Sequence, residues 1–135
     1  MTTEKAPRGT EVSAPFWQSV EGGQVKIPYC GSCSSYFFYP RSFCPHCWSG
    51  SVEWRLISGK GSVWSFTEVH FPFFRGEWKE QIPYVVALIQ LEEGVRMLSN
   101  LVDCPGEDLR IGLPVELVCR ELNGQVMPLF RPLMR

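Results

Sequence analysis

The sequence of 135 residues lacks a long apolar run and an apolar leader. Its longest apolar stretches, such as YVVALI, are far shorter than the roughly 20 residues that a membrane-spanning helix needs. The first residues, MTTEKAPRGTEVS, are polar and contain no hydrophobic segment of the kind found in secretory signals. These absences predict a protein of the cytoplasm without a membrane segment.

An excess of positive charge is also missing, since thirteen Lys and Arg residues face fourteen Asp and Glu residues and the net charge is −1. The sequence therefore has no basic field that would attract nucleic acid or an anionic membrane. The length predicts one domain of ordinary size or two very small ones. A hydrophobic fraction of 44%, with nine Phe and five Trp, is enough for a packed core.

Four of the six cysteines occur in one short segment, YCGSCSSYFFYPRSFCPHCWSG, as two Cys-x-x-Cys pairs. Zn²⁺ prefers a tetrahedron of four such ligands, and four thiolates leave no position open to water, so the site would be structural. Two disulfides or a redox-active Cys-x-x-Cys are the alternatives. Dense cysteines in a reducing compartment indicate metal binding before either of them. The expected ligands are Cys30, Cys33, Cys44 and Cys47.

Three residues beside these cysteines are unusual. Ser34 and Trp48 each follow the second cysteine of a pair, where zinc-binding turns often carry glycine because it tolerates positive φ. His46 lies between Cys44 and Cys47 and could replace one of them as a ligand. Four thiolates already complete the set, so we expect His46 to be an exposed turn residue.

Caps, periodicity and turns predict the order of the elements. Ser13 and Pro15 are typical of a helix start and Gly22-Gly23 of a helix end. Asn123-Gly124 is typical of a tight hairpin turn. Five strands are expected at 59–71, 83–94, 95–103, 114–122 and 125–132, with at most one helical turn in the connection 104–113.

A break after the third strand and glycines at the start of the first strand fit a small Greek-key barrel of the OB type. The predicted fold is mainly β, with a short N-terminal helix, a rubredoxin-like zinc ribbon and a C-terminal five-stranded OB-fold barrel. The expected limits are 1–11 for a disordered tail, 12–25 for the helix, 26–53 for the zinc ribbon and 54–135 for the barrel.

The order of several blocks resembles one family. These blocks are PFW, the first Cys-x-x-Cys, YPR, CPHC, GKGSVWSFTEVH, IPYVVALIQLEEGVRMLSNLVD and RIGLPVEL. The sequence resembles the zinc-ribbon plus OB-fold family of acyl-CoA-associated proteins, known as a domain of unknown function, from about residue 12 to its end. The cysteine spacing is shared with many zinc ribbons, whereas the order of all the blocks is much more specific.

The resemblance implies a role as a required small subunit of thiolase-like enzymes, including acyltransferases and side-chain-cleaving aldolases. It implies that the catalytic residues belong to the partner, and that the small subunit stabilises it and helps to form the acyl-CoA channel. The sequence adds no active site of its own. Acids near Cys104 would raise the pKa of its thiol, Cys119 is typical of a strand core, and His70 with Glu68 does not make a triad.

Large apolar residues gather in the loop before the second barrel strand and near the C-terminus. Loops usually avoid exposing such groups, and interfaces concentrate them. These residues either pack back onto the chain or contact the partner. The same two alternatives apply to the apolar side of the helix. The candidate interface residues are Phe16, Trp17, Phe71, Phe73, Phe74, Trp78, Phe130 and Leu133.

Coenzyme A would need cations for its phosphates. The candidates, which could equally be solvated surface residues, are Arg75, Lys79, Arg96 and Arg110. A nucleic-acid-binding module is the rival function, since OB barrels and zinc ribbons both occur there and aromatic residues could stack on bases. The balanced charge argues against that rival, because single-strand grooves are lined with cations.

Overall fold

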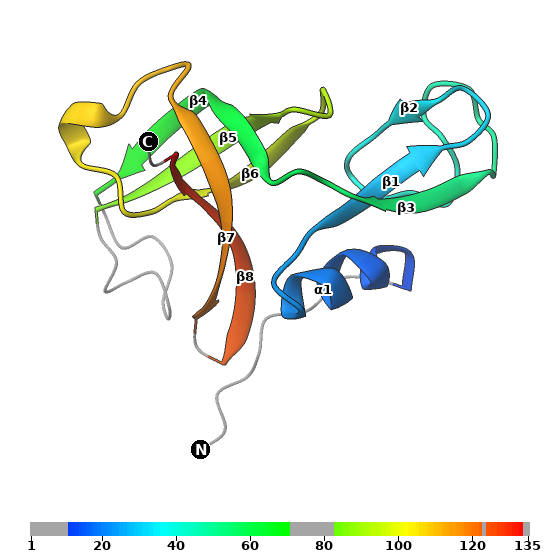
Figure 1. The fold of residues 1–135 in the computed structure, drawn as a ribbon, viewed down its shortest axis with the longest axis horizontal. Helices are drawn as coiled ribbons and strands as arrows, with labels where there is room; N and C mark the ends of the chain where they lie inside the picture. Colours follow the sequence, from blue (N-terminus) through cyan, green and yellow to red (C-terminus); the bar gives the residue numbers. More distant parts are fainter. Residues whose placement is uncertain (1–10, 71–82, 123, 134–135) are drawn as a thin grey trace.

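The computed structural model describes residues 11–70, 83–122 and 124–133. A three-stranded sheet carrying the cysteines lies beside a β-barrel (Figure 1). One helix lies below the sheet in this view, next to the barrel. The fold prediction is confirmed: the chain is mainly β, with one short helix, a ribbon bearing the cysteines and a closed five-stranded barrel. The predicted tail at 1–11 lies almost entirely outside the described residues.

The helix α1, Ala14–Glu21, follows a 3-10 turn, η1, at Glu11–Ser13. It begins after Ser13 with a proline in its first turn and ends at Glu21, where Gly22 is the C-cap and Gly23 follows at φ +84°. Glycine adopts this left-handed backbone without a steric penalty, which is why the predicted end is where the helix stops. The Ser19 hydroxyl donates to the Phe16 carbonyl (2.6 Å) and accepts from the Lys26 N–H (3.0 Å). The helix is thereby fixed to the strand that follows.

The ribbon sheet consists of β1 (Lys26–Cys30), β2 (Ser35–Tyr36) and β3 (Val52–Leu56), in the order β2-β1-β3. All of β3 pairs with β1, from Cys30↔Val52 to Lys26↔Leu56. The strand therefore crosses the limit that we expected between 53 and 54. Its backbone belongs to the ribbon, while the Trp54 side chain packs against the main core.

The barrel consists of β4 (Lys60–Val69), β5 (Tyr84–Leu91), β6 (Arg96–Leu101), β7 (Pro114–Leu122) and β8 (Gln125–Pro132). It closes in the order β4-β5-β6-β8-β7. The connection between β6 and β7 holds one 3-10 turn, η3, at Gly106–Asp108, as expected. The seam between β6 and β8 is short, because these parallel strands pair only at Leu101↔Phe130.

One core joins the modules. Side chains of the helix and β1 meet side chains from inside the barrel, and all of them are buried: Phe16, Val20, Val25, Ile27, Val63, Ala87, Ile89, Leu91, Met97, Leu101, Leu113, Val115 and Phe130. Phe16 is only 5% exposed and Phe130 is fully buried. Both are candidate partner contacts: Phe130 has no exposed surface, whereas Phe16 keeps a small exposed edge that lines a groove beside α1.

The linker between the ribbon and the barrel is held from three sides. The Ile57 N–H donates to the Val25 carbonyl (3.0 Å) and the Leu117 N–H donates to the Gly59 carbonyl (2.6 Å). The carboxylate of Glu93, in the β5–β6 turn, accepts from the Ser58 N–H (3.0 Å). These bonds connect the linker to the segment after α1, to β7 and to the β5–β6 turn. They therefore fix the orientation of the ribbon on the barrel.

We expect Gly61→Ala to destabilise the barrel. A Cβ at this position would lie 2.4 Å from the Gln90 carbonyl oxygen on the paired strand β5. The backbone would have to shift, which costs about 1–3 kcal/mol in the free energy of unfolding measured by denaturant titration. Gly106→Ala is the control, because its Cβ would meet nothing within 4 Å. Equal stability of the two variants would contradict the close approach.

Candidate metal centre and the surfaces around it

The four predicted ligands converge on one point. All four sulfur atoms lie within 4.8 Å of one another, with 3.5 Å between Cys30 Sγ and Cys47 Sγ and 3.7 Å between Cys33 Sγ and Cys44 Sγ. Zn–S bonds of about 2.3 Å in a tetrahedron place the sulfurs about 3.8 Å apart. The donor set and its spacing therefore fit a structural zinc ion.

Each Cys-x-x-Cys pair forms a tight turn around its first sulfur. The Cys33 N–H points at Cys30 Sγ (3.5 Å), and the His46 N–H points at Cys44 Sγ (3.3 Å). The turns close when the N–H groups of Ser34 and Trp48 donate to the carbonyls of Cys30 and Cys44 (2.9 and 2.8 Å). N–H groups directed at sulfur stabilise thiolates, and thiolate is the form that binds metal.

The sequence positions where glycine was expected keep the backbone that glycine would adopt. Ser34 has φ +57° and Trp48 has φ +67°. Both lie in the left-handed region, which is unfavourable for residues with a Cβ. The absence of glycine therefore changes the strain in the two turns but not their geometry. His46 is exposed and stays outside the sulfur cluster, as predicted.

Two of the thiols differ strongly in proton affinity. The hydrogen bond from the Cys33 backbone lowers the pKa of Cys30 to about 7, although burial opposes the shift. At Cys47 the Ser49 backbone N–H favours a lower pKa, but hydrogen bonding with Cys30, burial and the other two sulfurs raise it to about 12. The thiolate form binds metal, so coordination would release the protons of all four thiols.

We expect Cys44→Ser to reduce zinc from an equimolar amount to almost none, because a hydroxyl cannot replace the buried thiolate as a ligand. The ribbon should then become sensitive to proteases within 26–53, while the barrel keeps its fold. The measurements are metal analysis and limited proteolysis of the purified chain.

Cys119→Ser is the matched control. Cys119 is a partly buried strand residue that packs against the main core, outside the sulfur cluster. Its replacement should leave the zinc content unchanged. Full zinc in the Cys44 variant, or loss of zinc in the Cys119 variant, would contradict the ligand set.

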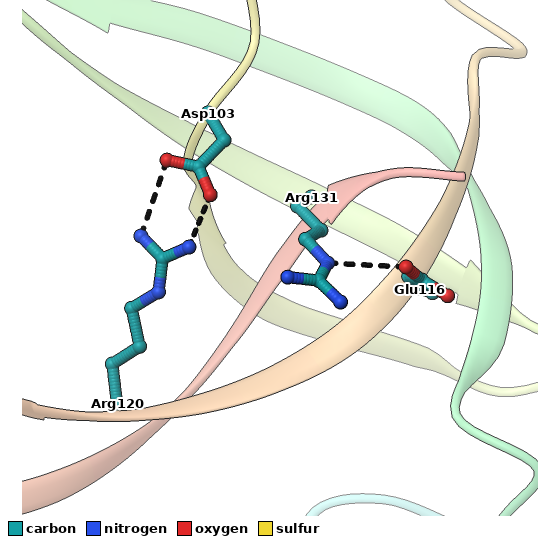
Figure 2. Close-up of polar contacts among 4 residues, drawn as sticks. All are labelled: Asp103, Glu116, Arg120 and Arg131. Carbon is teal, nitrogen blue, oxygen red and sulfur yellow. Dashed lines mark hydrogen bonds and ion pairs between the residues drawn. The ribbon is translucent and has the colours of Figure 1, made fainter. Parts of the chain in front are cut away.

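The exposed end of the barrel carries a clamp of ion pairs (Figure 2). Arg120 on β7 holds both carboxylate oxygens of Asp103, which follows β6. The pair links the two strands that flank β8 in the barrel, and Arg131 of β8 pairs with Glu116 of β7 (3.0 Å). The hydrogen bond from Arg120 lowers the pKa of Asp103. The clamp therefore reinforces the short β6–β8 seam at neutral pH, and it weakens as acid protonates Asp103.

The candidate coenzyme A residues are scattered. Arg75 and Lys79 lie outside the described residues. Arg96 stacks over the Trp64 ring (3.9 Å to the centroid) and donates to the side-chain oxygen of Gln90 (3.0 Å). Arg110 donates to the Asp108 carbonyl (3.3 Å) beside η3. Figure 1 places η3 and the start of β6 at opposite ends of the barrel, so these two arginines do not form one phosphate site.

The side chains that were considered for catalysis, Cys104 and the pair His70 and Glu68, have the following contacts. Cys104 Sγ donates to the Pro105 carbonyl (3.4 Å), and burial followed by the charge of Asp108 raises the pKa of its thiol. A nucleophile requires the opposite shift. His70 Nε2 lies 3.5 Å from a Glu68 carboxylate oxygen, and both side chains are exposed.

The remaining interface candidates divide into two groups. Phe71, Phe73, Phe74 and Trp78 lie outside the described residues. Trp17 is half-buried and lines a groove of about 230 Å³ between α1, the segment after β2, β6 and β8. Exposed Tyr39 and Leu98 border the same groove, and Leu133 is exposed at the end of β8.

Some exposed apolar residues were missed as surface features. Leu98 lies in the strand expected at 95–103, and its exposure of 55% was not predicted. Trp48 is 73% exposed and stacks on Phe43. Its position after Cys47, where glycine is common, was the signal that could have indicated this.

The fold and the sulfur cluster define a class of protein in which a zinc ribbon precedes an OB-fold barrel. The chain belongs to the ChsH2 family, because the family's rubredoxin-like zinc ribbon domain matches residues 17–53 and its C-terminal OB-fold domain matches residues 54–120. Among the described residues, no helix is long and apolar enough to pass through a membrane.

Three curated relatives illustrate the family. A DUF35 domain-containing scaffold protein of Methanothermobacter thermautotrophicus is 40% identical over 71% of this chain and 71% of its own length. A probable enoyl-CoA hydratase alpha subunit of Thermomonospora curvata is 35% identical over 87% of this chain but only 36% of its own length. The benzoylsuccinyl-CoA thiolase subunit BbsA of Thauera aromatica is 31% identical, over 57% of this chain and 51% of its own length.

A solved structure described as the Ltp2-ChsH2(DUF35) aldolase matches with a TM-score of 0.84 and 31% identity. The match covers 94% of this chain and 98% of the other. The whole described arrangement, helix and ribbon and barrel together, is therefore the arrangement of that relative.

Proposed function

We propose that this chain is a non-catalytic accessory subunit of an enzyme complex that acts on acyl-CoA, and that the catalytic residues lie on a thiolase-like partner. The observation that carries the proposal is the likeness to chains described as a scaffold protein, a thiolase subunit and part of an aldolase. The thiol of Cys104, whose pKa is raised, and the closed set of four sulfurs support it, because neither supplies a reactive group.

The partner surface that we propose includes the groove between α1, β6 and β8. Its lining is almost entirely apolar and includes Trp17, Leu98 and Met127. Leu98 is 55% exposed although it lies in the middle of a strand. Apolar groups that gather around a concave site are typical of a protein interface. The loop aromatic residues Phe73 and Phe74 remain part of this proposal from the sequence.

Coenzyme A is proposed to bind at the junction with the partner. Arg96 and Arg110 lie at opposite ends of the barrel and each already donates a hydrogen bond within the chain. They do not make a complete pyrophosphate site without further cations. A thioester should therefore bind the assembled complex much more tightly than the isolated chain, as isothermal titration with acetyl-CoA would measure.

A nucleic-acid-binding function is the weaker alternative. Most of the described arginines engage groups of the chain itself, as Arg55 does with Glu53 (2.6 Å) and Arg120 with Asp103. The net charge of −1 argues against the cationic groove that binds single strands. A salt-dependent mobility shift with an oligonucleotide would favour this alternative.

The complex can be tested directly. We expect the tagged chain, expressed in its native host, to retain a thiolase-fold protein identified by mass spectrometry. The purified chain alone should release no CoA from an acyl-CoA substrate, whereas the complex should. Turnover by the isolated chain, or recovery without an acyl-CoA enzyme, would contradict the proposed function.

If Leu98 is an anchor of the groove, Leu98→Ser should weaken this complex by about tenfold, because the few anchor residues of an interface each cost more than about 1 kcal/mol when truncated. Leu56→Ser is the control, since Leu56 is exposed to a similar degree (50%) on β3 but does not line the groove. Surface plasmon resonance with the recovered partner measures both. Equal effects of the two substitutions would remove the groove from the interface.

A further inference from the structure

The second cysteine turn presents an aromatic pair to solvent. Trp48 is 73% exposed and Phe43 is 36% exposed. Their rings stack almost in parallel, with centroids 5.1 Å apart and an interplanar angle of 17°. The stack covers one face of the indole and leaves the other face open.

Trp48 has a backbone conformation that is unfavourable for a residue with a large side chain. Its φ of +67° lies in the left-handed region, where a Cβ is unfavourable and glycine is not. Burial in a core would compensate for such a conformation, but most of the indole surface remains in water. A glycine would therefore serve the metal-binding turn better than the tryptophan does. In the free chain the stack on Phe43 is the contact that the structure gives this ring, and most of the indole surface is left available to a partner.

The first cysteine turn provides an internal comparison. Ser34 has the same type of backbone, φ +57°, at the equivalent position after Cys33. It carries a small polar side chain that is exposed. The two turns are alike in backbone geometry, and a large aromatic residue occurs in only one of them. The indole is thus not a requirement of the turn.

We propose that the Phe43–Trp48 pair is a second anchor of the interface, inserted into an apolar pocket on the larger enzyme subunit. This inference rests on the proposed function, which supplies that subunit. Tryptophan is enriched among the residues that dominate binding energies, and such residues are surrounded by polar groups. Here the neighbouring hydroxyls of Ser32 and Ser49 contact each other (2.8 Å) at the exposed surface and would form that polar rim.

The charge around the pair favours a protein over a phosphate-bearing ligand. Residues 36–54, which surround the pair in the sequence, contain a single lysine or arginine, Arg41, two residues before Phe43. Nucleic acids and the pyrophosphate of coenzyme A are held by cations or by several directed N–H groups. An indole stacked on a phenyl ring supplies neither, so the surface is suited to an uncharged, apolar pocket.

Trp48→Gly tests this inference because its effects on stability and on binding can be separated. Thermal denaturation of the zinc-loaded chain should show a Tm above that of Trp48→Ala and no lower than that of the wild type, since the relief of backbone strain offsets the loss of the ring stack. Surface plasmon resonance with the purified thiolase-fold partner should show binding weakened by about tenfold or more. A destabilised or misfolded ribbon would weaken binding too, but it would lower the Tm.

Ser34→Gly is the matched control, with the same relief of strain in the other turn. It should raise the Tm and leave partner binding unchanged. Trp48→Ala keeps the strained backbone and removes the ring, so it should weaken binding as much as Trp48→Gly without the gain in Tm.

Unchanged partner binding by Trp48→Gly would overturn the inference while leaving the proposed function intact. So would a variant that binds the partner normally but loses binding to an oligonucleotide or to acetyl-CoA. If the wild-type chain itself does not bind any acyl-CoA enzyme, the proposed function fails and this inference fails with it. The three results are distinguishable because the wild type is measured beside each variant.

Discussion

The convergence of four sulfur atoms is the constraint on which the ribbon depends. The apolar cluster around it has only Cys30, Phe37 and Cys44 as buried members, with Val52 packed against them. Such a cluster is too small to hold two turns and a two-residue strand in place. Metal coordination supplies the missing stabilisation, since a site that exists only in the folded chain adds its binding free energy to folding.

The barrel reaches stability by another route. Its strands share one core with α1 and β1, so the helix covers the inside of a barrel whose β6–β8 seam is short. Asp103 and Arg120 hold the outer side of that seam (Figure 2). An exposed ion pair of this kind contributes little by itself, and two hydrogen bonds in a fixed geometry make it more specific. The two modules therefore combine a metal cluster with a common apolar core.

Much of this arrangement could be predicted from the residues. Cap residues predicted both ends of α1, and runs of β-branched, aromatic and apolar residues bounded by turn signals predicted all five barrel strands. The limit expected between 53 and 54 falls within β3, where the Trp54 side chain packs with the main core while its backbone belongs to the ribbon sheet, and this limit stays a prediction. Phe16 and Phe130 looked like surface contacts because an apolar helix side and an apolar final strand are also what a barrel filled by a helix requires. Exposure of Trp48 depends on the backbone conformation of one turn, which composition and periodicity do not encode.

The hydrogen bonds around the linker have a mechanical meaning. Ser58 is hydrogen-bonded to Glu93, and its neighbours Ile57 and Gly59 are hydrogen-bonded to Val25 and Leu117. A force applied to the ribbon is therefore transmitted to the barrel and does not bend the linker. The chain then behaves as a strut of fixed length and angle. A strut of this kind holds whatever is attached at its two ends at a constant separation.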